Sequence, residues 1–485
     1  MINIRLIGHH YEHDVFELVR VFFPDRPINI IREQRGSFHG LVIDSIYDEE
    51  SRTATAILFE NKEEISTVEL GIDDFKCLKH LTNPEVKIIK SAIYEALSTY
   101  TDKQMPWGIM TGIRPVKVAH NILKSGLEPQ EQLDCFTKLF RVSEKNAKMM
   151  FEIAQRQKDY LDFDPDSFSL YVNIPFCPTR CVYCSFPTVL FEKYKDFVAD
   201  YVDKLVEEIQ LTKLLIKDRK LSTVYIGGGT PSSIPVKELQ RIIQTIKQTF
   251  GEPVSGEFTV ECGRADTITT PLIRMLASNG VNRISINPQS LVDETLKKIG
   301  RNHTENEVFE AYNLAKRLGI QIINMDLIVG LPGEDEGHIK TTLQKINKLD
   351  PENLTIHTLS LKKGSDLFRK NEFELKEENT IRNMLDITEE FAKDNDYEPY
   401  YLYRQKNILG NFENIGYSKP GFECIYNIIS MEEAQTIIGV GMGAVSKMYF
   451  PKEDRLERIA NFKSIEEYIN RFHEQIRRKE AAYNE

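Results

Sequence analysis

From residue 167 to residue 359 the chain alternates short β-rich runs with longer amphipathic segments. The β-rich runs end at polar or glycine residues, and the segments between them carry apolar residues at helical spacing. Repeated strand–helix units of this kind place their strands parallel in one sheet. The expected strands lie at 169–174, 222–226, 257–261, 282–287, 321–329 and 353–359, and the expected helices near 192–217, 235–250, 270–279, 304–318 and 336–348.

Polar or glycine residues stand at the ends of these strands. In barrels of parallel strands the chemistry gathers at the C-terminal ends of the strands. Because the polar features arise independently along the chain, their agreement predicts one functional rim. A histidine such as His357 is nonetheless more often a hydrogen-bonded core residue than a ligand. In chain order the rim holds the cysteine run 177–184, the turn 227–231, Glu261, Asn287, Gln289, Asp326 and His357.

Three cysteines follow the first expected strand in the run FCPTRCVYCSF: Cys177, Cys181 and Cys184. Thiolates at this C-x3-C-x2-C spacing can each bind a different iron of one cubane cluster, which leaves the fourth iron without a ligand from the motif. An open iron can bind a small molecule and pass an electron to it. Zinc is the alternative, but zinc normally takes four ligands from paired C-x2-C blocks. The other cysteines are scattered and predict neither a second block nor a disulfide framework; they are Cys77, Cys135, Cys262 and Cys424.

The regions on either side of the repeat have their own patterns. Residues 1–165 are expected to form an N-terminal α+β domain, joined by the acidic, proline-containing stretch LDFDPDSF to a core at 166–375. Its last helix, 143–160, has Ser143 as a plausible N-cap. The C-terminal region, 376–485, is predicted to be mainly helical around an aromatic, glycine-rich segment. The other expected elements of the N-terminal domain are strands at 2–8, 41–47, 53–59 and 65–70 and helices at 14–23, 85–99 and 116–124.

The composition of the chain limits which classes of binding partner are expected. A length of 485 residues with 41% hydrophobic and 28% charged side chains is typical of a globular protein of two or three domains. The sequence shows no secretory signal and no apolar run long enough for a membrane span, and the scattered cysteines favour a cytoplasmic location. A net charge of −11 without a dense Lys/Arg block argues against a nucleic-acid partner. A local basic pocket remains compatible with an anionic substrate.

Five segments carry a family resemblance: YVNIPFCPTRCVYCSF, YIGGGTPS, TVECGRADTIT, RISINPQSLVDETLKKIGRNHT and INMDLIVGLPGE. Together they resemble the coproporphyrinogen dehydrogenase-like radical S-adenosylmethionine (SAM) family over roughly residues 165–450, and the N-terminal run MPWGIMTGIRP resembles its HemZ type. The resemblance implies an α/β fold with a partial (β/α)6 TIM-like barrel. It also implies SAM, one 4Fe-4S cluster on the three cysteines, and a low-potential electron donor of flavodoxin or ferredoxin type.

The resemblance further implies which residues bind SAM. Tyr171 would lie against SAM near the cluster, Tyr183 would pack beside the adenine, and the glycine turn would receive the amino group of the methionine moiety. Carboxylates suit ammonium and hydroxyl groups, and Arg301 suits a carboxylate. The alternatives are packing for the tyrosines, capping or ion pairing for the carboxylates, and a surface position for Arg301. The implied set is Tyr171, Tyr183, Gly228, Gly229, Thr230, Glu261, Gln289, Arg301 and Asp326.

The implied activity is oxidative decarboxylation of the propionates of coproporphyrinogen III to vinyl groups, which yields protoporphyrinogen IX in haem biosynthesis. One position departs from this pattern. Dehydrogenases of the family carry a further cysteine two residues after the third cluster ligand, where this chain has Phe186. The haem-chaperone branch of the family also has phenylalanine there. A haem-binding chaperone without dehydrogenase activity and a radical-mediated haem-degrading enzyme therefore remain as alternatives.

Overall fold

The computed structural model describes residues 1–31, 40–112, 114–370, 377–405, 411–451, 453 and 455–483. The chain divides into two compact units, one of Met1–Gln155 with Leu402–Lys406 and the other of Arg156–Tyr401 with Asn407–Glu485. Within the described residues, no helix is long and apolar enough to cross a membrane.

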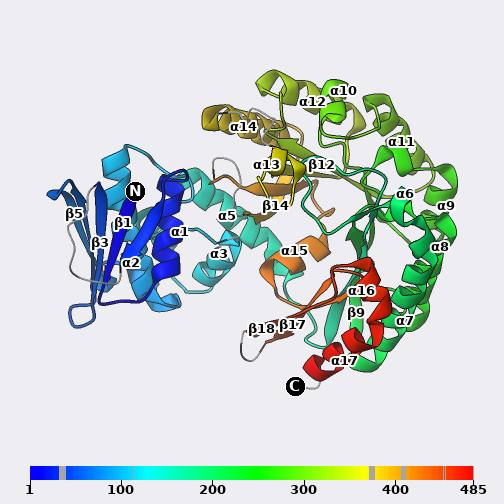
Figure 1. The fold of residues 1–485 in the computed structure, drawn as a ribbon, viewed down its shortest axis with the longest axis horizontal. Helices are drawn as coiled ribbons and strands as arrows, with labels where there is room; N and C mark the ends of the chain where they lie inside the picture. Colours follow the sequence, from blue (N-terminus) through cyan, green and yellow to red (C-terminus); the bar gives the residue numbers. More distant parts are fainter. Residues whose placement is uncertain are drawn as a thin grey trace. The chain divides into compact units, whose positions relative to one another are not determined.

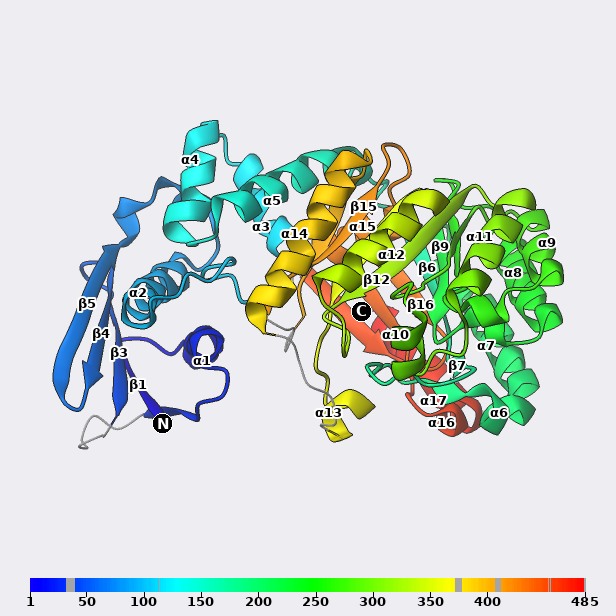
Figure 2. The same ribbon diagram turned by 90° about the horizontal axis from the view of Figure 1, so that it is seen from above.

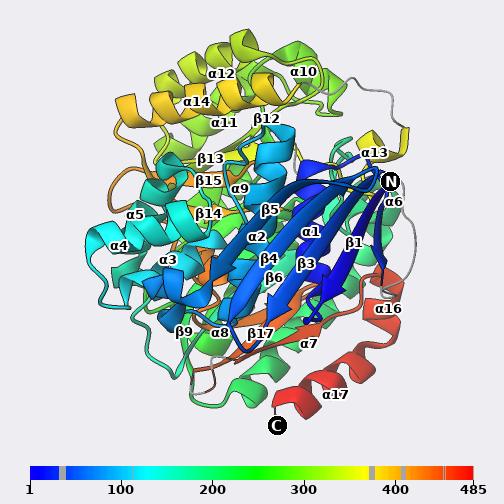
Figure 3. The ribbon, with the colours of Figure 1, turned by 90° about the vertical axis from the view of Figure 1, so that its left-hand side faces the viewer.

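The first unit is built on a five-stranded sheet in the order β2-β1-β3-β4-β5. Strand β1 runs parallel to both of its neighbours, β2 and β3, and β4 and β5 extend the sheet from β3 as an antiparallel meander. Helices α1 (Glu12–Phe22) and α2 (Pro84–Thr101) lie on the same face of the sheet (Figures 1 and 2). The strands are β1 (Ile2–Ile7), β2 (Ile28–Ile31), β3 (Leu41–Asp48), β4 (Thr53–Glu60) and β5 (Glu63–Gly71), seen face-on in Figure 3.

Short helices complete this unit. Ser143 caps α5 as predicted, since its Oγ accepts a hydrogen bond from the Asn146 N–H at 3.3 Å. Cys77 and Cys135 form a disulfide. The expectation of unpaired cysteines is wrong for this pair, because 58 residues separate them and spacing does not reveal their contact. The helices are η1 (Ile72–Asp74), η2 (Lys76–His80), α3 (Pro115–Leu123), α4 (Pro129–Asp134), the π-helix η3 (Cys135–Leu139) and α5 (Glu144–Gln157). The last two residues of α5 and the following η4 (Lys158–Tyr160) belong to the second unit.

The second unit contains six parallel strands whose order in the sheet follows the chain. Helices return between successive strands and cover the outside of the sheet (Figures 1 and 2). This arrangement confirms the partial barrel, and all six strands lie where the alternation predicts them. They are β6 (Ser167–Ile174), β9 (Lys220–Gly228), β10 (Phe258–Glu261), β11 (Arg283–Ser285), β12 (Ile322–Val329) and β13 (Asn353–Thr358), with helices α7 (Val198–Ile216), α8 (Val236–Phe250), α9 (Thr270–Ser278), α10 (Asp293–Lys298), α11 (Glu305–Arg317) and α12 (Glu336–Leu349).

Strands from the C-terminal region extend both edges of the barrel sheet. The sequence pattern predicts helices here but not these strands, which bring the sheet to 11 strands. One pair joins beside β13, and three more strands continue from β6. The elements are α13 (Asp366–Lys370), α14 (Glu378–Asp394), β14 (Glu398–Tyr403), β15 (Asn414–Ser418), α15 (Ile425–Glu432), β16 (Thr436–Val440), β17 (Val445–Phe450), β18 (Arg455–Ala460), α16 (Ile465–Asn470) and α17 (Phe472–Tyr483).

A buried ion pair ties the C-terminal helices to the barrel. The carboxylate of Glu208 on α7 accepts hydrogen bonds from Lys479 Nζ at 2.7 Å and from the Tyr468 hydroxyl at 2.6 Å. It also accepts from Asn461 Nδ2 at 2.9 Å and from the Gly441 backbone N–H at 2.8 Å. Gln475 Nε2 donates to the same carboxylate at 3.2 Å, so five donors meet on one fully buried carboxylate.

Candidate functional site

The cysteine run forms a loop that leaves the end of β6. The short strand β7 (Phe176–Cys177) pairs with β8 (Val189–Leu190), which closes the loop at its base. Cys181 is buried, whereas Cys177 and Cys184 are half-buried. The Thr230 hydroxyl lies 3.7 Å from Cys177 Sγ, and Arg264 Nη1 lies 3.8 Å from Cys181 Sγ. Hydrogen-bond donors thus already point at two of the three sulfurs.

Electrostatics opposes ionisation of these thiols in the cofactor-free protein. Burial raises the pKa of Cys177, and it raises the pKa of Cys184 to about 11, with further increases from the neighbouring cysteines. A positive metal centre reverses this effect because it stabilises the thiolate. Among the described residues, no three His, Cys, Asp or Glu side chains are gathered closely enough to hold a single metal ion.

The glycine turn after β9 packs directly on the cysteine loop. The Gly229 N–H donates to the Ile174 carbonyl at 2.8 Å, and the Thr230 N–H donates to the Phe176 carbonyl at 2.7 Å. Gly228 has a φ of +110°, and a Cβ there would lie 2.0 Å from Asn173 Oδ1. A side chain is therefore excluded at Gly228 by both backbone conformation and space.

Glu261 ends β10 beside this turn. Its carboxylate accepts a hydrogen bond from the Tyr225 hydroxyl at 2.6 Å and another from the Gly228 backbone N–H. Burial raises the pKa of Glu261 to about 7, and the charge of Asp326 raises it further. Glu261 is thus a carboxyl group that a nearby cation would convert to its ionised form.

Three tyrosines stack next to Glu261. The ring of Tyr225 lies 4.4 Å from that of Tyr426, and Tyr171 lies 6.2 Å from the first and 6.1 Å from the second, centroid to centroid. Tyr171 is therefore part of an aromatic wall, as its packing interpretation requires. Sequence reasoning missed Tyr225 and Tyr426. Tyr225 could have been found, because it stands two residues before the glycine turn.

Asp326 lies on β12 between two polar neighbours. Asn324 Nδ2 donates to its Oδ1 at 2.7 Å, and His357 Nε2 lies 3.5 Å from its Oδ2. Burial opposes ionisation of Asp326, but the hydrogen bond and charge of His357 outweigh it and hold the pKa below its ordinary value. His357 therefore interacts with the carboxylate of a predicted site residue, and this contact is compatible with a hydrogen-bonded histidine.

Gln289 and Arg301 are both buried. Gln289 has a φ of +68°, which is strained for a residue other than glycine, and its Oε1 has no hydrogen-bond partner among the described residues. Arg301 Nη1 donates to the carbonyls of Gly263 and Asn287, each at 2.8 Å, and Nη2 donates to the Tyr183 hydroxyl at 3.1 Å. Arg301 is thus not a surface arginine, and much of its guanidinium is already used to fix strand ends and Tyr183.

Direct contacts join predicted positions in two parts of the site, one around Cys181 and the other around Asp326. Cys184 donates its N–H to the Cys181 carbonyl at 3.0 Å, and Arg301 and Tyr183 both contact Cys181. In the second part, the Gln289 N–H donates to the Asp326 carbonyl at 2.9 Å. The sulfurs, the tight glycine turn, the acid with a raised pKa and the unpartnered buried amide oxygen fit an iron-sulfur cluster with an amino-acid-bearing cofactor. Arg264, which sequence reasoning missed, contacts Cys181 from the β10–α9 loop.

Comparisons with known proteins identify the family and the fold of the chain. The Radical SAM superfamily matches residues 171–346. The chain is 41% identical over 399 residues to the oxygen-independent coproporphyrinogen-III oxidase-like protein HemZ of Bacillus subtilis. The aligned region covers 80% of this chain and 79% of that protein. It is 32% identical over 276 residues to the heme chaperone HemW of Lactococcus lactis, which covers 57% of this chain and 68% of that one. The solved structure of the Escherichia coli coproporphyrinogen III oxidase HemN, a radical SAM enzyme, matches with a TM-score of 0.53 and 22% identity over 67% of this chain and 73% of that one, which shows a shared fold.

Proposed function

The chain belongs to the radical SAM superfamily, in its HemZ-type group of oxygen-independent coproporphyrinogen III oxidase-like proteins, and from this premise we propose that it decarboxylates the propionate side chains of coproporphyrinogen III. Each of the two reacting propionates would lose one hydrogen atom to the 5′-deoxyadenosyl radical, release CO2, pass one electron to a one-electron acceptor, and become a vinyl group. The product would be protoporphyrinogen IX, formed without oxygen. A low-potential donor of flavodoxin or ferredoxin type would supply electrons to the cluster.

The observation that carries this proposal is the packing of the cysteine loop on the glycine turn at the ends of β6 and β9. When bound, a 4Fe-4S cluster and SAM supply a 5′-deoxyadenosyl radical, which removes hydrogen from the substrate. Cys177, Cys181 and Cys184 would hold the cluster. The turn Gly228, Gly229 and Thr230 would border SAM closely because no side chain intervenes at the glycines.

The polar residues of the rim would orient SAM. Glu261 would pair with the ammonium group of the methionine moiety, and Asp326 with hydroxyl groups. Gln289 would offer its unpartnered Oε1 as an acceptor. Arg301 would act mainly by holding Tyr183 in place, since that contact exists already at 3.1 Å. The stacked tyrosines would exclude water from one side of the site.

A haem chaperone is the second candidate, and Phe186 favours it. The side chain of Phe186 is 66% exposed on the cysteine loop, where dehydrogenases of the family have cysteine. An exposed phenylalanine beside the site offers apolar surface for a planar macrocycle. The similarity to a heme chaperone points the same way.

Product analysis separates the candidates. The cluster-reconstituted protein would be incubated anaerobically with coproporphyrinogen III, SAM and a reductant, and the products identified by mass spectrometry. The proposal predicts the divinyl product together with 5′-deoxyadenosine. Haem transfer to an apoprotein without decarboxylation would support the chaperone, and an opened macrocycle would indicate haem degradation.

A further inference from the structure

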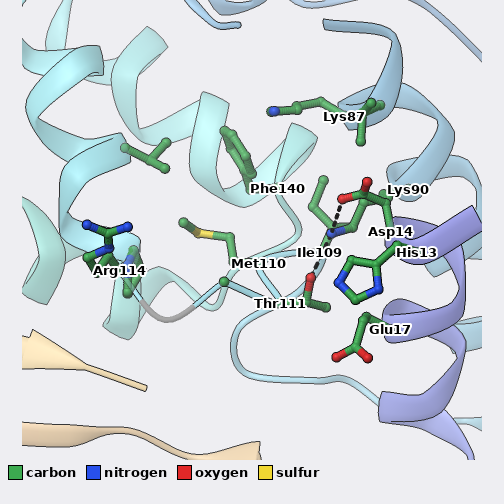
Figure 4. Close-up of a pocket in the computed structure, with 14 residues that line it drawn as sticks. His13, Asp14, Glu17, Lys87, Lys90, Ile109, Met110, Thr111, Arg114 and Phe140 are labelled. Atoms are coloured by element: carbon green, nitrogen blue, oxygen red, sulfur yellow. Dashed lines mark hydrogen bonds and ion pairs between the residues drawn. The ribbon is translucent and has the colours of Figure 1, made fainter. Parts of the chain in front are cut away.

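The first unit contains a pocket of about 400 Å³ of its own (Figure 4). Helices α1 and α2, the loop that follows α2 and the start of α3 line it. A volume of this size lies within the range of small-molecule sites, which is roughly 300–1,000 Å³. The cysteine loop and the glycine turn contribute no lining residue.

Residues 109–112 and 114–115, from the run MPWGIMTGIRP, build one wall of this pocket. Trp107 is fully buried, and the Ile109 N–H donates to the Phe140 carbonyl at 2.9 Å. Gly108 has a φ of +50°, and a Cβ there would lie 2.0 Å from the Phe140 carbonyl oxygen. Arg404, from the 402–406 segment of the same unit, lies 5.2 Å above the Trp107 ring and donates to the Met110 carbonyl. The wall is therefore fixed by tight packing and needs no ligand to form it.

Two lysines of α2 supply positive charge to the opposite wall. Lys90 is only 7% exposed, and its ammonium donates to Thr111 Oγ1 at 2.9 Å and lies 4.0 Å from Asp14 Oδ1 (Figure 4). Burial lowers the pKa of Lys90 to about 8 although Asp14 raises it, and burial also lowers the pKa of Lys87. The carboxylates present therefore do not fully compensate the burial of the Lys90 ammonium group and the partial burial of that of Lys87.

By formal charge, the lining holds three cations, Lys87, Lys90 and Arg114, and two carboxylates, Asp14 and Glu17. From α1, Glu17 is paired with Arg20 at 3.1 Å, and Asp14 is shared with Lys90. Arg114 adds a cation to the lining, and Arg404 adds its charge to the surroundings of Lys90. The rest of the wall is mainly apolar and consists of Val86, Ile109, Met110, Val118 and Phe140.

We propose that this pocket binds a small organic carboxylate, with its anionic group on Lys87 and Lys90 and its apolar body against Ile109, Met110 and Phe140. A carboxylate would complete the hydrogen bonding of the ammonium groups and offset their burial. An apolar body of one or two rings matches both the volume and the hydrophobic wall. The site goes beyond the proposed function and stands whether or not that function holds.

The test compares a charged and a neutral probe of the same shape. Binding of naphthalene-2-carboxylate and of naphthalene-2-carboxamide to the full-length protein would be measured by saturation-transfer NMR and calorimetry at neutral pH. The carboxylate is expected to bind about tenfold more tightly than the amide, as one charge-assisted hydrogen bond requires. Equal affinities, or no binding of the carboxylate, would overturn the proposal.

Variants place the binding in this pocket. Lys87→Met and Lys90→Met should each remove most of the preference for the carboxylate, and Phe140→Ala should weaken both probes. Lys148→Met is the matched control, because Lys148 is exposed on α5 and pairs only with Glu144 at 2.5 Å among the described residues. Lys87 is half-buried, so its variant keeps the test open if Lys90→Met fails to fold. Unchanged carboxylate binding in folded Lys87→Met protein would place the probe elsewhere and contradict the proposal.

Discussion

At the scale of the residue, the candidate site combines short local sequence patterns with side chains from segments that are distant in the chain. Cysteine spacing and the glycine turn are local patterns, so Cys177, Cys181, Cys184 and Gly228 can be read directly. The roles of Tyr426 and Arg264 depend on segments that meet only after folding, and no local pattern marks them. The same holds for the disulfide in the first unit.

Under the proposed function, Glu261 is the residue whose charge state would matter most for SAM binding. Its pKa of about 7 means that it is largely protonated at pH 6 and ionised at pH 8. SAM affinity of the cluster-loaded protein should therefore rise across this range, because only the ionised carboxylate attracts an ammonium group. Glu261→Gln should bind SAM about tenfold more weakly at pH 8 and lose this pH dependence. Equilibrium binding at several pH values tests this; wild-type affinity and pH dependence in the variant would exclude the assigned role.

The same substitution, Glu261→Gln, should weaken SAM binding but increase the stability of the cofactor-free protein. A raised pKa means that the contribution of Glu261 to stability is present below its ordinary value of 4.5 and is lost as pH rises through about 7. Glu261→Gln should therefore stabilise the cofactor-free protein at pH 8, by on the order of 1–3 kcal/mol. Denaturant titrations at pH 5 and pH 8 measure this, and the gain should be absent at the lower pH.

Cysteine replacement tests the ligand set. Cys181→Ala should lose most of its iron and all SAM cleavage, because the motif supplies only three ligands and a cubane with two is under-coordinated. Cys424→Ala is the matched control, since Cys424 is buried beside Glu257 rather than in the cysteine loop. Iron and sulfide analysis after anaerobic reconstitution gives the answer. Full iron content in Cys181→Ala, or iron loss in Cys424→Ala, would show that the ligands are misassigned.

At the scale of the element, the barrel is predictable because each strand and helix has its own period in the sequence. The strands β14–β18 cannot be predicted in this way. Some of them pair with a strand that is distant in the chain, and the others lie in segments interrupted by glycine and aromatic residues. Strand β16, for example, completes its hydrogen bonds on β6, more than 250 residues earlier. Such pairings come from the whole sheet rather than from local sequence.

The turn after β9 allows a test with a matched glycine. Gly228→Ala should weaken SAM binding and destabilise the protein by about 1–3 kcal/mol, since it adds both backbone strain and a clash with Asn173. Gly319→Ala introduces comparable backbone strain, at a φ of +94°, where a Cβ would meet nothing within 4 Å. The control should lose stability but keep SAM affinity. Equal SAM affinities for the two folded, cluster-loaded variants would argue against a role of the turn in binding.

The anchor of α17 is a second element-scale prediction. Lys479→Met should cost about 3–5 kcal/mol, because it leaves Glu208 buried without its cation. The double variant Glu208→Gln with Lys479→Met should recover part of this loss. Denaturant unfolding of the C-terminal region measures both. A single variant as stable as the wild type would mean that the ion pair contributes little.

At the scale of the whole molecule, the partial barrel and its family are clear from sequence, whereas the substrate is not. The barrel brings the cysteine loop, the glycine turn and the carboxylates to one rim. The fit of that rim to the cluster and SAM does not depend on which tetrapyrrole the protein binds as its substrate. Because Phe186 stands where dehydrogenases of the family have cysteine, the dehydrogenase and the haem chaperone remain two functions that an experiment must distinguish. The pocket in the first unit adds a site that the barrel motifs do not anticipate.

The coupling of SAM consumption to CO2 release tests the central claim most directly. Anaerobic reactions with and without coproporphyrinogen III, labelled at the propionate carboxyls, would follow 5′-deoxyadenosine and labelled CO2 together. The proposed function predicts that both rise in step and that neither forms without the substrate, because a closed site prevents unproductive turnover. SAM cleavage without CO2 release, or stoichiometric haem binding and transfer with no decarboxylated product, would contradict it.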